Sequence, residues 1–233
     1  MEKRKAIGIL GGMGPMATCD LMEKMIRCTY AERDQDYIRI CVDSNTAIPD
    51  RTAAILHGGA DPLPEMVKSA VRLQGMGADV LAMSCNTAHY FHGEIQRFID
   101  IPLLHMPRET AKHLRESGVR RAAVLATDGT VQCGIYGDAL AAEGIEAIYP
   151  DAEEQALVMS LIYDCVKAAK PCPVPERIHA MAARLQAQGA EVLVLGCTEL
   201  PIAFAQLGVQ TPTVDPTEVL ARAAVRFVGG TLR

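Results

Sequence analysis

The chain has 233 residues, which is enough for two lobes that each bury a core. Hydrophobic residues make up 49% and charged residues 22%, and the net charge of −5 comes without a basic cluster, which argues against a nucleic-acid partner. The apolar run near the start is cut short by Gly11 and Gly12, and no run approaches the roughly 20 residues of a membrane span. We therefore expect a cytoplasmic protein that binds neither nucleic acid nor membrane.

Eight cysteines raise the question of a disulfide or metal framework. The sequence contains neither a Cys-x-x-Cys pair nor a His/Cys cluster with zinc spacing. Free cysteine is among the most buried residue types, so most of these thiols are expected to be small core residues. The pattern predicts no metal site.

Apolar runs that favour strands alternate with helical patterns along the chain. In chain order, the predicted elements are a strand at residues 6–10, a helix at 15–30, a strand at 38–43, a helix at 63–76, strands at 80–83 and 121–126, and a helix at 153–169. Strands without polar alternation are typical of sheets that are buried on both faces. The predicted fold class is α/β, with mainly parallel sheets flanked by helices.

The second half of the chain repeats part of the first. Residues 70–87 (AVRLQGMGADVLAMSCNT) align with residues 182–199 (AARLQAQGAEVLVLGCTE) at a constant offset of 112, and nine of the eighteen positions are identical. Each copy predicts a helix that ends at a glycine, then a buried strand, then a cysteine at the carboxyl end of the strand. We infer two pseudo-symmetric lobes, residues 1–115 and 116–210, with residues 211–233 packing back on the first lobe.

The repeat places Cys85 and Cys197 at equivalent strand ends. Ligands bind outside the carboxyl ends of parallel strands, so two symmetric lobes would present both thiols to one cleft. Inversion of a stereocentre needs one group that removes a proton and a second that delivers a proton to the opposite face. Two alternatives stay open: the cysteines are packing residues kept after duplication, or they form a redox disulfide, which requires Cα atoms within about 7 Å.

Four motifs resemble the aspartate/glutamate racemase family, and its aspartate racemase branch best. These motifs are residues 11–18 (GGMGPMAT), 48–52 (IPDRT), 85–89 (CNTAH) and 196–200 (GCTEL). The resemblance implies a racemase of acidic amino acids that uses no pyridoxal phosphate or other cofactor, has its active site between two lobes, and forms a homodimer. Glutamate racemases proper open with Asp-Ser-Gly and carry a histidine after the second Cys-Thr, where this chain has Glu199.

The resemblance also implies further site residues. Met13 and Gly14 would line the site, and Arg51, which we expect in a loop, would bind a carboxylate as a bidentate partner. Lys167 matches a family lysine that faces the substrate, although a solvated lysine is the simpler interpretation. Glu199 could orient the thiol or the substrate ammonium, or serve as a first-turn helix acid.

Small polar residues near the thiols complete the predicted site. The hydroxyl and amide side chains could hydrogen-bond the substrate's ammonium and α-carboxylate, or they could cap helices. His89 could tune the Cys85 thiol, although a structural role is the commoner one for a lone histidine. The hydroxyl and amide residues are Asn86, Thr87, Thr127 and Thr198.

The predicted function is cofactor-independent racemisation of an acidic amino acid, aspartate first and glutamate second, with Cys85 and Cys197 as the two bases. The alternatives are a racemase of broader specificity, a decarboxylase or cis–trans isomerase of the same superfamily, and a non-catalytic two-lobed solute-binding module. The decarboxylase or isomerase would need only one thiol, and the binding module would need neither.

Overall fold

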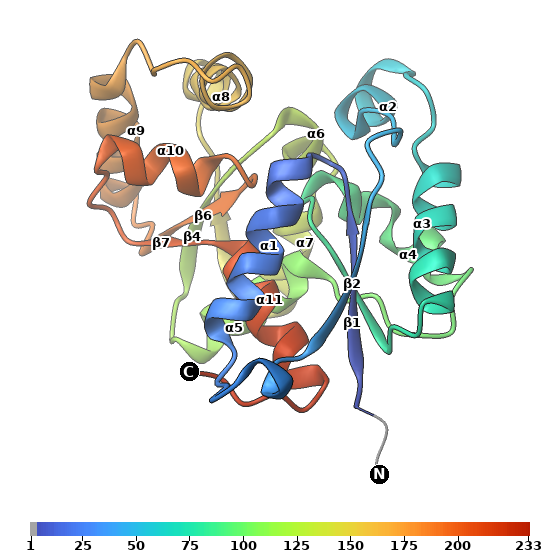
Figure 1. Cartoon of the computed structure of the whole chain (residues 1–233). Helices are drawn as coiled ribbons and strands as arrows, with labels where there is room; N and C mark the ends of the chain where they lie inside the picture. Colours follow the sequence, from blue (N-terminus) through green and yellow to red (C-terminus); the bar gives the residue numbers. More distant parts are fainter. Residues whose placement is uncertain (1–3) are drawn as a thin grey trace. The chain divides into compact units, whose positions relative to one another are not determined.

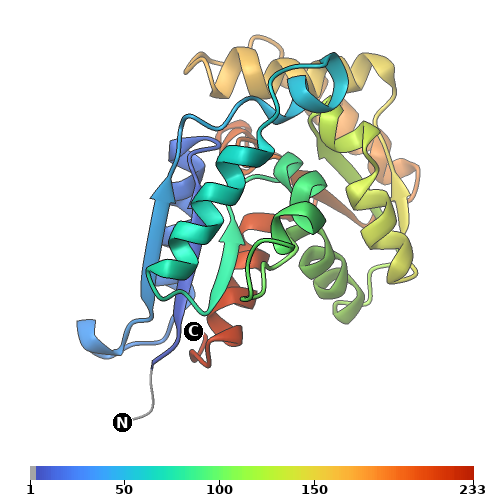
Figure 2. The same cartoon turned by 90° about the vertical axis from the view of Figure 1, so that its right-hand side faces the viewer.

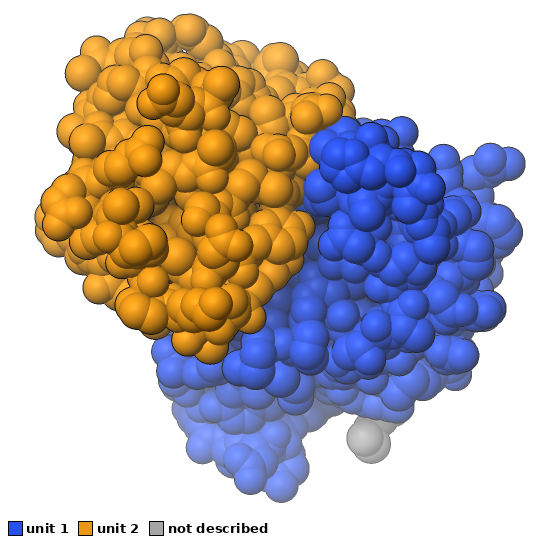
Figure 3. Space-filling model, turned by 90° about the horizontal axis from the view of Figure 1, so that it is seen from above, with its two compact units in different colours: residues 1–109, 217–233 blue, residues 110–216 orange. Residues whose placement is uncertain are grey.

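The computed structural model describes residues 4–233 and divides the chain into two compact units, coloured separately in Figure 3. Unit 1 comprises residues 4–109 together with Thr217–Arg233, and unit 2 comprises Thr110–Pro216. No helix within residues 4–233 is both long enough and apolar enough to cross a membrane.

Unit 1 is built on a three-stranded parallel sheet in the order β2–β1–β3. Its central strand, β1, pairs with both neighbours, so that Ile7 lies between Ile40 and Val80. The elements are β1 (Ala6–Gly11), α1 (Pro15–Cys28), η1 (Asp34–Asp36), β2 (Arg39–Ser44), α2 (Arg51–His57), α3 (Leu63–Gly75), β3 (Val80–Met83), η2 (Thr87–Phe91) and α4 (His92–Gln96), with parts of α5 (Met106–Glu116) and α11 (Pro216–Phe227).

Helices cover both faces of this sheet, which explains why its strands carry no polar alternation. On one face, Leu81 packs in a cluster with Leu73 of α3. On the other face, Ile9 packs with Leu21 of α1 and Val225 of α11. The same arrangement is visible in Figure 1, where α3 lies on one side of β1 and β2 and α1 on the other, and Figure 2 looks onto the α3 side.

Unit 2 is built on a four-stranded parallel sheet in the order β5–β4–β6–β7. Its largest core cluster joins Leu193 and Leu195 of β6 to helices through Leu185 and Phe204. The elements are β4 (Arg121–Ala126), α6 (Asp128–Gln132), α7 (Ile135–Ala142), β5 (Glu146–Ile148), α8 (Ala152–Ser160), η3 (Leu161–Val166), α9 (Pro175–Ala187), β6 (Val192–Gly196), α10 (Leu200–Leu207) and β7 (Thr213–Val214).

The two sheets have the same strand order, with β2, β1 and β3 equivalent to β5, β4 and β6. A parallel bridge between Leu81 and Leu103 continues unit 1 at the position that β7 occupies in unit 2. Even single hydrogen bonds recur, because Leu81 N donates to Pro102 O over 2.8 Å and Leu193 N to Pro212 O over 2.9 Å. The predicted α/β class with two pseudo-symmetric lobes is confirmed.

The helix that precedes the cysteine strand ends in the same way in both copies of the repeat. Gly77 has a φ of 90° and Gly189 a φ of 97°, values that L side chains rarely adopt. The next residue donates back into the last helical turn, Ala78 N to Leu73 O over 3.2 Å and Ala190 N to Leu185 O over 3.1 Å. Both ends are therefore Schellman motifs, which redirect the chain into a buried strand.

We predict that Gly77→Ala and Gly189→Ala each destabilise the fold, and that the second substitution is the more damaging. The positive φ alone costs a non-glycine residue about 1–2 kcal/mol. A Cβ at position 77 would meet almost open space, whereas one at position 189 would overlap the Arg121 guanidinium, which is bonded to Glu146. Urea unfolding of both variants checks the order.

Gly75→Ala is the matched control for this pair. Gly75 is the last residue of α3, its φ is not positive, and a Cβ there would meet no atom within 4 Å. Alanine should therefore leave stability unchanged or raise it by up to about 1 kcal/mol, because it stiffens the unfolded chain. Equal losses in the free energy of unfolding for Gly75→Ala and Gly77→Ala would contradict the role assigned to the positive φ of Gly77.

Candidate active site

The predicted site residues of unit 1 lie in or just after three loops, and each loop follows the carboxyl end of a parallel strand. Met13 and Gly14 follow β1, Arg51 lies beyond β2, and Cys85 lies two residues after the end of β3. Because the strands are parallel, these loops leave the same edge of the sheet. The Arg51 Nη2 atom donates to the Met13 carbonyl over 3.4 Å, so two of the loops are in contact.

Hydrogen bonds hold the backbone of Ser84 and of Cys85. Ser84 N donates to Leu10 O of β1 over 3.2 Å, which extends the pairing of β3 past its last residue. His89 Nδ1 lies 2.8 Å from the Cys85 carbonyl oxygen, and because a carbonyl only accepts, Nδ1 carries the proton. The same nitrogen lies 3.2 Å from the Asn86 carbonyl oxygen, so His89 contacts the backbone of both residues.

Thr18 connects the loop of residues 12–14, here called the glycine loop, to Ser84 after β3, and it is not among the predicted site residues. Its hydroxyl oxygen accepts from Gly12 N over 2.8 Å, lies 3.1 Å from Gly14 O, and lies 3.2 Å from the Ser84 hydroxyl. The Thr18 side chain is buried, and Ser84 is fully buried. A polar residue at a buried helix position was the available signal, since it falls within the motif at residues 11–18.

Arg51 is the first residue of α2, so the expectation that it lies in a loop is wrong by one residue. Asp50 is the N-cap, and its Oδ1 atom accepts from Ala53 N over 2.7 Å. The Arg51 side chain turns back on its own loop, where Nη1 donates to Pro49 O over 2.8 Å and to Ile48 O over 3.4 Å. The cap sets Arg51 as the first residue of α2, and it therefore sets the position of the backbone from which the guanidinium extends.

In unit 2, the predicted residues again follow strand ends. Thr127 follows β4 and caps α6, its hydroxyl accepting from Thr130 N over 3.4 Å. Cys197, Thr198 and Glu199 directly follow β6 and precede α10. The capping interpretation of Thr127 is therefore confirmed.

The Cys197 thiol has a carboxylate partner. Its Sγ atom donates to Glu199 Oε2 over 2.9 Å, and Thr198 Oγ1 donates to the same oxygen over 3.0 Å. A charged acceptor makes such hydrogen bonds stronger than neutral ones, so the side chains of these three residues hold each other in place. The interpretation of Glu199 as the residue that orients the thiol matches this geometry.

Lys167 lies at the end of a helical segment that differs from the predicted one. The helix expected over residues 153–169 is α-helical only to Ser160, and Leu161–Val166 form a π-helix that ends at Lys167. A π-helical turn shifts every later side chain around the helix axis, which apolar spacing alone does not reveal. The Lys167 Nζ atom lies 4.2 Å from the centroid of the Tyr163 ring, a cation–π contact.

The positions of the two cysteines are equivalent in their own units, but their polar partners differ. Both cysteines are buried, with 8% of the residue surface exposed, and both belong to the apolar clusters beside their sheets. Asn86 and Thr87 are buried after Cys85, at the start of the short helix η2, whereas the longer helix α10 follows Cys197. Each cysteine therefore lies at the edge of an apolar core, just after the carboxyl end of β3 or of β6.

Three histidines of unit 1 lie close together, and one of them, His89, contacts the Cys85 backbone. The ring centroids of His89 and His105 are 5.3 Å apart, and those of His92 and His105 are 4.7 Å apart. Burial, reinforced by the neighbouring His92, lowers the pKa of His89 to about 4, and burial lowers the pKa of His105 to about 3. Burial also lowers the pKa of His92, and Arg108 opposes protonation of His92 and His105. At neutral pH these rings are uncharged.

We predict that stability falls as the pH is lowered from about 6.5 to about 4. In the unfolded chain His89 regains its ordinary pKa of about 6.5 and takes up a proton in this range, while the folded chain does not. The shift corresponds to about 3 kcal/mol for this one residue. Urea unfolding at several pH values gives the free energy of unfolding as a function of pH. This free energy should depend less on pH in His89→Asn, which keeps a donor for the Cys85 carbonyl. Its pH dependence should be unchanged in the exposed control His57→Asn.

Comparisons with known proteins agree with this arrangement. A family model described as Asp/Glu/Hydantoin racemase matches residues 10–224. The broad specificity amino-acid racemase RacX of Bacillus subtilis (strain 168) is 30% identical over 226 residues, which cover 94% of this chain and 96% of RacX. Among solved structures, the Picrophilus torridus aspartate racemase is 33% identical with a TM-score of 0.86, covering 98% of this chain and 96% of that one. An aspartate racemase homologue from Pyrococcus horikoshii OT3 is 25% identical with a TM-score of 0.80, covering 96% and 99%. The chain therefore belongs to the aspartate/glutamate/hydantoin racemase family and is an amino-acid racemase of the type that works without pyridoxal phosphate.

Proposed function

We propose that this racemase inverts the α-carbon of an acidic amino acid, aspartate first and glutamate second, with Cys85 and Cys197 as its two acid/base groups. The observation that carries the proposal is the equivalence of the thiols. Cys85 follows β3, which pairs with β1, and Cys197 follows β6, which pairs with β4. Both cysteines lie at the end of the repeated helix–strand–cysteine segment. As the composition and the family resemblance lead us to expect, the enzyme would act as a homodimer in the cytoplasm.

The proposed reaction balances without a cofactor. One cysteine, as thiolate, takes the α-proton, and the electrons of the broken Cα–H bond delocalise into the α-carboxylate. The other cysteine, as thiol, delivers its proton to the opposite face of the α-carbon. Turnover exchanges the protonation states of the two thiols and leaves the enzyme ready for the opposite enantiomer.

Glu199 supports this assignment of Cys197. The 2.9 Å hydrogen bond between them orients the Sγ–H bond of Cys197 toward the Glu199 carboxylate. When substrate binds, the same carboxylate would accept a hydrogen bond from the substrate ammonium. We propose that Asn86, Thr87 and Thr198 supply further polar contacts around the α-carbon.

The substrate class follows from two cations. We propose that Arg51 and Lys167 bind carboxylates, while the loop that carries Met13 and Gly14 offers backbone N–H groups to the α-carboxylate. A guanidinium has five N–H donors, and the Ile48, Pro49 and Met13 carbonyls use only part of this set. Two cations exceed what one α-carboxylate needs, so the substrate side chain is proposed to be a second carboxylate.

A racemase of broader specificity is the second candidate. The observation that favours it is the 30% identity to RacX, whose name gives it broad specificity, over nearly the whole of both chains. In that case neutral amino acids would turn over at rates that compete with those of the acids.

We predict that Cys85→Ser and Cys197→Ser each lower racemisation by roughly 10²–10⁴-fold, because a serine hydroxyl is a far weaker base than a thiolate. Purified variants are incubated with L- or D-aspartate in deuterated water, and inversion and α-deuterium are measured separately. The family resemblance assigns removal of the α-proton of the L-enantiomer to Cys197, so Cys85→Ser should still introduce deuterium into L-aspartate.

Cys19→Ser is the control for this experiment, because Cys19 is an exposed thiol on α1. It should keep full activity, and all three variants should keep the wild-type unfolding midpoint. Wild-type activity in either Cys85→Ser or Cys197→Ser would rule out the two-thiol mechanism.

We predict that Arg51→Leu lowers kcat/KM for aspartate and glutamate by roughly 10- to 100-fold, which is the loss of charge-assisted hydrogen bonds. The values for alanine and methionine should change much less, because neither carries a side-chain carboxylate. Arg97→Leu, which removes an exposed arginine, is the control and should leave all four values unchanged. If alanine or methionine outcompetes both acids in the wild type, the broader specificity is the correct one.

A further inference from the structure

We propose that Asn45 is a positioning residue that sets the place of Arg51 and thereby the affinity for the substrate's carboxylate. The inference rests on the proposed function, because it takes Arg51 to be the group that binds an acidic substrate. Asn45 directly follows β2, six residues before Arg51, in the loop that leads to α2. The contacts of Asn45 and of Arg51 all lie within unit 1.

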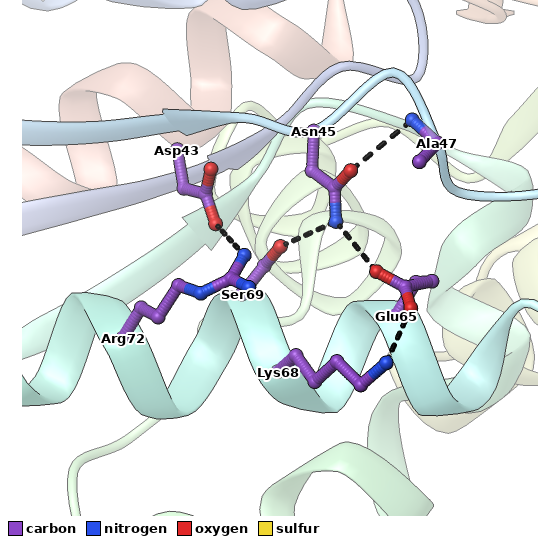
Figure 4. Close-up of polar contacts among 7 residues, drawn as sticks. All are labelled: Asp43, Asn45, Ala47, Glu65, Lys68, Ser69 and Arg72. Atoms are coloured by element: carbon purple, nitrogen blue, oxygen red, sulfur yellow. Dashed lines mark hydrogen bonds and ion pairs between the residues drawn. The ribbon is translucent and has the colours of Figure 1, made fainter.

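The Asn45 carboxamide uses its acceptor and both donors, as Figure 4 shows. Its Oδ1 atom accepts from Ala47 N over 3.1 Å, which folds the loop back on itself. Its Nδ2 atom donates to Ser69 Oγ over 3.1 Å and to Glu65 Oε2 over 3.3 Å, both on α3. One side chain therefore ties the β2–α2 loop to the neighbouring helix.

The backbone of Asn45 is fixed as well. Gly12, with a φ of 89°, packs so closely on the Asn45 peptide that any Cβ at position 12 would overlap it. Ile48 N donates to Asn45 O over 3.4 Å, and the Ile48 side chain is buried in the core cluster beside α3. The loop from Asn45 to Asp50 thus has one defined course between the glycine loop and α3.

Arg51 is held by this same loop. Two of its three carbonyl acceptors, Ile48 O and Pro49 O, belong to it, and the third, Met13 O, belongs to the glycine loop on which Asn45 packs. A shift of the loop away from α3 would therefore carry the guanidinium with it. The chain of contacts runs from Ser69 and Glu65 through Asn45 to Arg51.

The position requires a carboxamide because Glu65 faces it. Hydrogen bonds from Lys68 and then from Asn45 lower the pKa of Glu65, so its carboxylate is ionised at neutral pH. An aspartate at position 45 would set a second carboxylate against it, and the two donors of Nδ2 would be lost. The isosteric substitution Asn45→Asp therefore breaks the contact with Glu65 without removing any volume.

The test is the steady-state kinetics of Asn45→Asp with aspartate. We expect kcat/KM to fall about tenfold, mainly through a higher KM, because the substrate's carboxylate meets a displaced Arg51 while the thiols are unchanged. Asn45→Asp combined with Glu65→Gln should restore the wild-type KM, since the new glutamine amide can donate to the new aspartate. Lys68→Met removes the 2.6 Å ion pair at the edge of the same network and is the control with wild-type kinetics.

The outcomes separate this inference from the proposed function. A wild-type enzyme that does not racemise aspartate or glutamate would refute the proposed function before any substitution is made. If the wild type is active, an unchanged KM in Asn45→Asp, a loss in kcat alone, or a double variant that does not recover would each overturn the positioning role. Recovery of the wild-type KM in the double variant would support it.

Discussion

The burial of both sheet faces is the constraint on which the rest of the structure depends. Ile9 and Leu81 in unit 1 and Leu193 and Leu195 in unit 2 belong to the apolar cores, and the strands β1, β3 and β6 are buried along their whole length. Polar chemistry is consequently displaced to the loops at the carboxyl ends, where backbone N–H groups are available. The glycine loop, the β2–α2 loop and the cysteine turns follow from this displacement.

The two thiols are equivalent in backbone position, yet different residues hold them. His89, kept neutral by burial, donates to the Cys85 backbone, whereas Glu199 accepts from the Cys197 thiol itself. This difference does not conflict with racemisation. Two enantiomers have equal free energies in water, so kcat/KM must be equal in the two directions whatever the surroundings of each thiol. Unequal surroundings of the two thiols can make kcat and KM differ between the two directions, but only by the same factor.

The sequence allowed the elements, the repeat and the cysteine positions to be predicted, because these follow from local periodicity and from similarity between the two halves. It did not reveal contacts that join distant segments, such as Thr18 with Ser84 or Asn45 with Ser69. The π-helical turn before Lys167 was also missed, since an apolar stripe continues through it almost unbroken. What could not be predicted is the set of polar contacts that aim the loops, because each one depends on tertiary packing.

The way in which Arg51 is held bears on what it can bind. Its guanidinium donates to backbone carbonyls, and no ion pair within residues 4–233 includes it. Carbonyl dipoles orient a cation without neutralising it, whereas a carboxylate partner would already neutralise the positive charge of the guanidinium. Partial burial of such a cation is unfavourable until an anion arrives, and an acidic side chain would relieve that cost. If the proposed function holds, a loop that holds Arg51 on backbone carbonyls without a counter-ion would favour a substrate with a side-chain carboxylate.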